Sequence, residues 1–61
     1  MKVFEVVTQY CKNDKIIDEH QFVSGKTLKG VTDYFTQRCE EIEHDLKSVR
    51  EVLTIVEHVS E

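Results

Sequence analysis

Long apolar runs are missing from this sequence of 61 residues. No stretch approaches the ~20 apolar residues that a membrane-spanning helix needs. Met1 is followed by Lys2-Val3-Phe4-Glu5, which lacks the apolar run of a signal peptide. We therefore expect a cytoplasmic protein that does not associate with membranes.

Disulfide and metal ligands are also scarce, since the chain has two cysteines and three histidines. In the cytoplasm Cys11 and Cys39 should be reduced thiols, and their spacing matches no CxxC motif. We interpret both as small, buried or half-buried apolar residues. A chain of this length buries only about 60% of its unfolded surface, so a single small domain over residues 1–61 is expected to depend on a partner, either another protein or a second copy.

Basic residues are outnumbered, with 8 Lys and Arg against 12 Asp and Glu and a net charge of −4. Proteins that neutralise phosphates need a basic face, so this balance disfavours nucleic acid as a partner. A homodimeric regulator that contacts nucleic acid through a local patch of Lys26 and Lys29 stays open as an alternative function.

The stretch Gly25-Lys26-Thr27 matches the end of a nucleotide-binding P-loop, but the first glycine of that motif is absent. His20 stands five places before Gly25, where the motif requires glycine. The stretch is better explained as a strand-to-helix junction with Thr27 as the helix N-cap, or Ser24 if the helix begins earlier. We expect no nucleotide and no other cofactor.

The first half of the chain predicts a hairpin. Residues 2–11 and 16–23 are dense in β-branched and aromatic types and contain neither glycine nor proline, and residues 12–15 supply turn chemistry. With Asn13-Asp14 as the loop, the facing residues would be Tyr10 and Ile17, Thr8 and Glu19, Val6 and Gln21, and Phe4 and Val23.

The second half predicts a helix followed by a strand. The spacing of Leu28, Val31, Phe35, Cys39, Ile42 and Leu46 is helical. Residues 49–59 are rich in β-branched types and predict a third strand, with Lys47-Ser48 as the helix end. The alternative is one helix over residues 27–58, which would make the chain a coiled-coil structural or assembly protein.

The element order therefore predicts an α+β fold, β-β-α-β, with a three-stranded antiparallel-type sheet. A right-handed crossover and short loops favour the strand order 2-1-3, with the helix packed on one face. The opposite face would carry an apolar patch that is large for a monomer. Its members are Val3, Val7, Ile16 and Phe22, joined by Val52 and Val56 or by Ile55.

Polar clusters offer weaker chemistry. Glu40 and His44 are spaced for two metal ligands on one helical face, but further ligands with suitable spacing are missing, so no metal site is expected. A fold of this size has little room for a cleft, and we expect no catalytic residues and no enzyme activity. The residues that we expect to contact a partner are Val3, Val7, Ile16, His20 and Phe22 on the sheet, and Glu40, Glu41 and Glu43 on an acidic helix face.

A resemblance supports a protein partner. The opening Val3-x-x-Val6-Val7, the turn residues Lys12-Asn13 and an aromatic helix residue, Tyr34 or Phe35, resemble the layout of small host-takeover proteins of tailed phages. The layout is similar to the Dmd-type antitoxins of T-even phages. The resemblance implies an inhibitor that occupies a binding surface of a host enzyme or toxin, and it carries over no functional residue.

Overall fold

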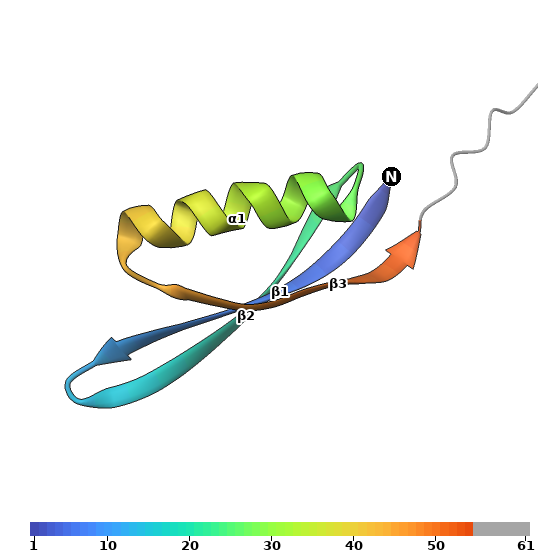
Figure 1. The fold of residues 1–61 in the computed structure, drawn as a ribbon. Coiled ribbons are helices and arrows are strands. Elements are labelled where there is room, and N and C mark those ends of the chain that lie inside the picture. Colours follow the sequence, from blue (N-terminus) through green and yellow to red (C-terminus); the bar gives the residue numbers. More distant parts are fainter. Residues whose placement is uncertain (55–61) are drawn as a thin grey trace, which may run out of the picture.

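The computed structural model describes residues 1–54 and contains a hairpin, a helix and a third strand (Figure 1). The elements are β1 (Lys2–Lys12), β2 (Lys15–Gly25), α1 (Leu28–Ile42) and β3 (Asp45–Thr54). The strand order is β2-β1-β3, and both outer strands run antiparallel to β1. The predicted β-β-α-β fold is thus confirmed. The described residues 1–54 include no helix that could span a membrane, and α1 itself has 15 residues.

The hairpin follows the predicted register. Tyr10 pairs with Ile17 and Phe4 with Val23, as expected from a two-residue loop. Asn13 and Asp14 have positive φ values of 53° and 63°, which is the backbone of a type I′ turn. Because that turn matches the right-handed twist of its strands, these two residues fix the alignment of the whole hairpin.

The junction between β2 and α1 is built as the sequence predicts. Thr27 is the N-cap, and its Oγ1 accepts a hydrogen bond from the backbone N–H of Gly30 at 3.0 Å. A Cβ atom at Gly25 would lie 2.5 Å from Cγ2 of Val31. Glycine therefore serves here to let the end of β2 approach the helix closely.

The predicted end of the helix is wrong. The helix ends at Ile42, and Glu43 follows with a left-handed φ of 59°. The N–H of His44 then donates to the carbonyl of Cys39 at 2.9 Å, which closes the final turn. The third strand begins at Asp45, before the predicted residue 49, so the alternative of one helix over residues 27–58 is also wrong. Predicted strand residues 55–59 lie outside the described residues.

Register shifts in β3 explain why the helix was predicted to extend to Lys47-Ser48. Thr8 pairs with Leu46 and Val6 with Val49, so these two β3 residues lie on the same face although they are three positions apart. The register shifts by one residue between them, because Lys47 has no partner in β1. A strand with such a bulge has apolar residues at a spacing of three, which imitates the spacing of a helix.

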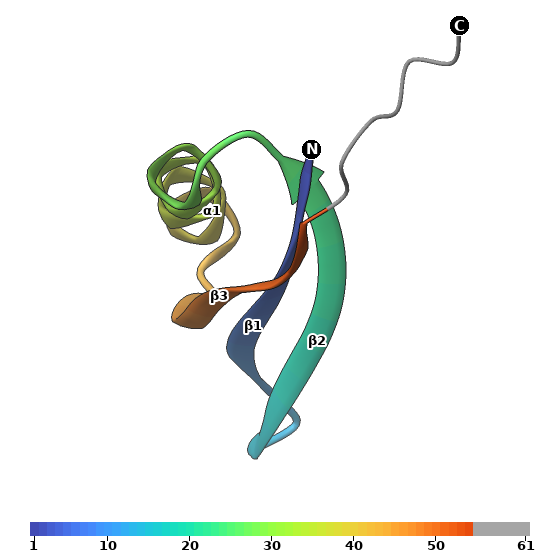
Figure 2. The same ribbon diagram turned by 90° about the vertical axis from the view of Figure 1, so that its right-hand side faces the viewer.

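The core lies between the sheet and α1. Phe4 and Val6 are fully buried and pack with Val31, and the surrounding half-buried residues are Val23, Phe35, Leu46 and Val49. The helix packs chiefly on β3, and Figure 2, which looks along the helix, shows it displaced from β2. Part of β2 on the helix side of the sheet is therefore not covered by α1.

Candidate protein-binding surfaces

The face of the sheet opposite α1, which we call the open sheet face, carries large exposed apolar side chains. Successive strand residues point to opposite faces, so the neighbours of the buried Phe4 and Val6 point away from the helix. Ile16 is 72% exposed, Phe22 67% and Leu53 55%. Val3 and Val7 on β1 are half-buried between them. Four of these residues were predicted for this face from the sequence, namely Val3, Val7, Ile16 and Phe22.

The contribution of β3 to this face differs from the prediction. Leu53, and not Val52, is the residue opposite Val3. Val52 is the unpaired residue where the register shifts between Val3 and Phe4. Val56, predicted for this face together with Val52, and Ile55, predicted as the alternative to that pair, lie outside the described residues.

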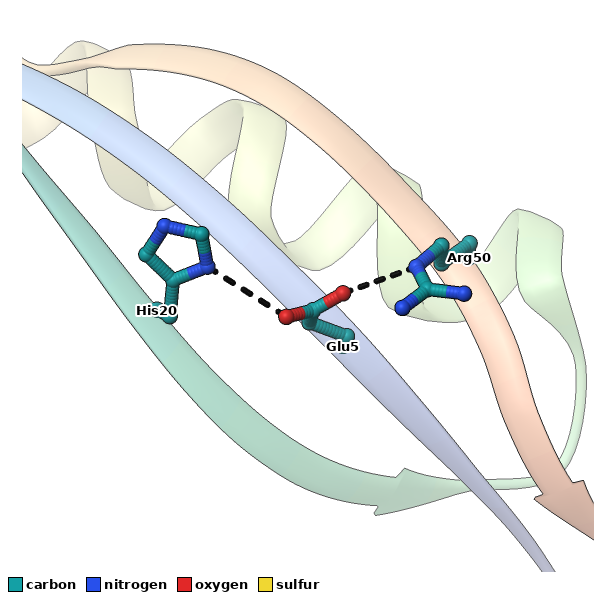
Figure 3. Close-up of polar contacts among 3 residues, drawn as sticks. All are labelled: Glu5, His20 and Arg50. Carbon is teal, nitrogen blue, oxygen red and sulfur yellow. Dashed lines mark hydrogen bonds and ion pairs between the residues drawn. The ribbon is translucent and has the colours of Figure 1, made fainter.

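A charged cluster occupies the middle of the open sheet face and takes one residue from each strand (Figure 3). Arg50 donates from Nε to Oε1 of Glu5 at 2.7 Å, and His20 Nδ1 lies 3.3 Å from Oε2 of the same carboxylate. The Glu5 side chain is 17% exposed, whereas Arg50 is 67% and His20 58% exposed. The carboxylate is thus enclosed by two partners that themselves reach into solvent.

The electrostatics of Glu5 follow from this arrangement. The hydrogen bond from Arg50, followed by that from His20, lowers the pKa of Glu5 below its ordinary value, although desolvation acts in the opposite direction. Glu5 is therefore held ionised and serves as the anchor of the cluster. His20 was predicted from the sequence as a contact residue, whereas Arg50 was not, because the bulges in β3 hide which of its residues faces Glu5.

A groove separates β2 from α1, with a volume of about 670 Å³. The expectation that this fold has little room for a cleft is therefore wrong. The groove exists because the helix packs chiefly on β3. Its apolar lining includes Val23, Val31, Tyr34, Phe35 and Ile42, and its polar lining includes Glu19, Gln21, Lys26 and Arg38. Tyr34 is 64% exposed and contacts Phe35 edge-on, with ring centroids 5.1 Å apart.

The predicted acidic helix face is only partly helical. Glu40 and Glu41 are exposed on the last turn of α1, but Glu43 is the C-cap, so the three carboxylates do not share one regular helix face. The last turn contains no basic residue, although Arg38 lies 3.6 Å from Glu41. Acidic groups at a helix C-terminus oppose the helix dipole, so this end is electrostatically unfavourable to the fold.

The possible Glu40–His44 metal pair is not brought together on a helix, since His44 lies beyond the helix end. The His44 ring instead stacks on Tyr10, with centroids 4.5 Å apart and an interplanar angle of 9°. Within residues 1–54 no group of three or more His, Cys, Asp or Glu side chains is arranged to hold a metal ion.

The two cysteines have different environments. Cys39 is buried as predicted, and burial, followed by the charge of Asp45, raises the pKa of its thiol. Cys11 is exposed, so the expectation of a buried or half-buried residue is wrong there. It lies one residue before the end of β1, beside the hairpin turn and beyond Gln9, where the pairing of β1 with β3 ends.

The basic patch proposed for nucleic acid is weakened by an ion pair. Lys29 donates from Nζ to Asp33 at 2.7 Å, one turn along the helix. Lys26 is exposed and lines the groove. Because one of the two expected cations is paired within the chain, the patch has little charge to offer to phosphates.

Comparison with protein-family models, with curated proteins and with solved structures finds no match for this chain. The function must therefore be inferred from the surfaces described above.

Proposed function

We propose that this chain is a small non-enzymatic protein-binding modulator that occupies a partner's surface with its open sheet face. One observation carries the proposal: exposed Phe22 and Leu53 flank the Arg50–Glu5–His20 cluster on the side of the sheet that α1 does not cover, and exposed Ile16 lies further along the same face, near the hairpin turn. Monomeric proteins seldom expose such a combination without a partner.

The composition of this face suits a protein partner. Aromatic residues and arginine contribute most often to the energy of protein interfaces, and Phe22 and Arg50 supply one of each. Burial of apolar surface stabilises a complex by about 25 cal/mol per Å² before the costs of association are subtracted. Glu5 holds the Arg50 side chain, so less of its conformational freedom is lost on binding.

The kind of partner follows from the resemblance to small host-takeover proteins of phages. Under this proposal the partner is a host or cognate protein, and the chain acts as an inhibitor or antitoxin. Glu40, Glu41 and Glu43 form a second candidate contact region, because their unfavourable position at the helix end suggests a use outside the fold. A basic patch on the same partner would be attracted to this region.

The test compares three substitutions that add the same charge, two on the open sheet face and one on the helix. Phe22→Asp places a carboxylate on the open sheet face, and Val7→Asp does the same on β1. Gln37→Asp places one on an exposed position of α1 and serves as the matched control. Each tagged chain is used to capture proteins from a lysate of the source cells, and the captured proteins are identified by mass spectrometry.

We expect the Gln37→Asp chain to capture the same protein as the wild type, and both sheet variants to lose it by tenfold or more, roughly the effect of losing one interface hot spot. Circular dichroism checks that each variant is folded. Equal capture by folded Phe22→Asp, Val7→Asp and wild-type chains would overturn the proposal.

A further inference from the structure

The outer edge of β2 is a second surface that the fold leaves without a partner. Within residues 1–54, β2 contacts only β1 and, to a small extent, α1. Figure 2 shows β2 at the margin of the sheet on the side away from the helix. Its outward backbone groups therefore have no strand to bond among the described residues.

The hairpin geometry identifies these groups. Lys12 and Lys15 close the two-residue turn as a hydrogen-bonded pair, so odd-numbered residues of β2 bond inward to β1. Even-numbered residues direct their N–H and C=O groups outward. The outward residues are Ile16, Asp18, His20, Phe22 and Ser24.

This edge lacks most of the devices that protect free strands. The β2 register is continuous over eleven residues, the chain contains no proline, and the one lysine of β2 is its first residue. The other outer strand, β3, is interrupted by two register shifts and lies beneath α1. Of the two outer strands, β2 is thus the one suited to regular pairing.

We propose that the β2 edge pairs antiparallel with β2 of a second copy, centred on His20, to form a continuous six-stranded sheet. A twofold axis through this centre aligns all eleven residues of each strand, and any other centre shortens the pairing. Five hydrogen-bonded residue pairs would give about ten backbone hydrogen bonds between the copies.

The side chains favour a second copy at this register. On the helix side, Ile17 lies opposite Val23 of the second copy, and Glu19 lies opposite Gln21. On the open sheet face, Asp18 lies opposite Phe22, so no two carboxylates face each other. With the axis at Glu19, this residue would face Glu19 of the second copy. With the axis at Asp18, the Asp18 carboxylates of the two copies would face each other.

Amide hydrogen exchange on the wild-type chain tests the pairing directly. We expect the N–H groups of the five outward residues to exchange about tenfold or more slowly at high than at low protein concentration, because pairing buries them only in the dimer. The inward N–H groups of Ile17, Glu19 and Gln21 are protected by β1 at both concentrations. Fast exchange of the outward groups at every concentration would overturn the proposal.

A matched pair of variants isolates the backbone. Asp18→Ala and Asp18→Pro both remove the carboxylate that accepts a hydrogen bond from Gln9, but only proline removes the outward N–H. Proline is tolerated on an edge strand when its missing N–H would face solvent. We expect sedimentation to show a dimer for Asp18→Ala and a folded monomer for Asp18→Pro. Equal dimerisation of the two variants would contradict the pairing. If Asp18→Pro does not fold, the hydrogen-exchange experiment on the wild-type chain tests the pairing instead.

Pairing of the β2 edges goes beyond the proposed function, and two variants test dimerisation and partner capture independently. Val7→Asp alters the open sheet face on the central strand, away from the β2 edge, and should abolish partner capture while the dimer persists. Asp18→Pro should abolish the dimer while capture persists. Loss of the dimer in Val7→Asp, with the chain still folded, would show that the copies associate through the open sheet face and would overturn pairing at the edge.

Discussion

At the scale of single residues, Glu5 links all three strands through its two hydrogen bonds on the open sheet face. Its partners come from strands that are adjacent only in the folded chain, so the lowered pKa of Glu5 is a property of the native state. A carboxyl group whose pKa is lower in the folded than in the unfolded state stabilises the fold at high pH.

The pH dependence of stability follows with a defined sign. The contribution of Glu5 is fully present above its unfolded pKa of about 4.5 and is lost as the pH falls through the lower folded pKa. We therefore expect the difference in unfolding free energy between wild type and Glu5→Gln to shrink as the pH falls below that value. Urea unfolding over a pH series measures it.

Arg50→Gln is the control for this experiment. It removes the largest cause of the lowered pKa, so the same comparison made in that background should show a smaller change with pH. A difference between wild type and Glu5→Gln that stays constant across the series would contradict the assigned role.

Gly25 has a steric role that the other glycine of the chain, Gly30, does not share. A Cβ at Gly25 would lie 2.5 Å from Cγ2 of Val31, a core residue, so Gly25→Ala must shift the Val31 side chain or the backbone that carries one of the two residues. We expect a loss of about 1–3 kcal/mol in unfolding free energy, the usual range for an overpacked site.

Gly30→Ala is the matched substitution. Its Cβ would meet only Oγ1 of Thr27, at 3.1 Å, and alanine favours a helix by up to about 1 kcal/mol over glycine. Denaturant unfolding should therefore show little loss or a gain. Equal losses at the two positions would mean that the contact with Val31 is not the cause.

At the scale of elements, the conformation of the hairpin turn depends on only two residues. Asn13 and Asp14 both have positive φ, and aspartate tolerates this backbone less well than glycine does. We expect Asp14→Gly to raise the unfolding free energy by about 0.5–1 kcal/mol and Asp14→Ala to lower it by about 1 kcal/mol. Denaturant unfolding that ranks alanine above glycine would contradict the type I′ geometry.

The sequence predicts elements well where their signals are local. The hairpin register depends on a two-residue turn, and Thr27 with Gly25 marks the start of α1, so both could be placed in advance. The end of α1 could not, because the bulge at Lys47 gives Leu46 and Val49 the spacing of a helix. The same bulges hid Arg50, whose position opposite Glu5 depends on the register of β3.

At the scale of the whole molecule, the placement of the helix decides which surfaces are available. Since α1 packs chiefly on β3, the groove beside β2 stays open, and sequence periodicity does not report such a lateral shift. The open sheet face, by contrast, follows from strand alternation and the order β2-β1-β3. Four of its apolar residues were therefore predictable, whereas the groove was not.

Site-specific photocrosslinking can show whether a partner protein contacts the open sheet face. A photoreactive phenylalanine analogue replaces Phe22 in one chain and Gln37, on the exposed side of α1, in another. On irradiation in the source cells, we expect position 22 to form a covalent adduct with a protein other than the chain itself, and position 37 to form none. An adduct at position 37 with none at position 22 would contradict the account.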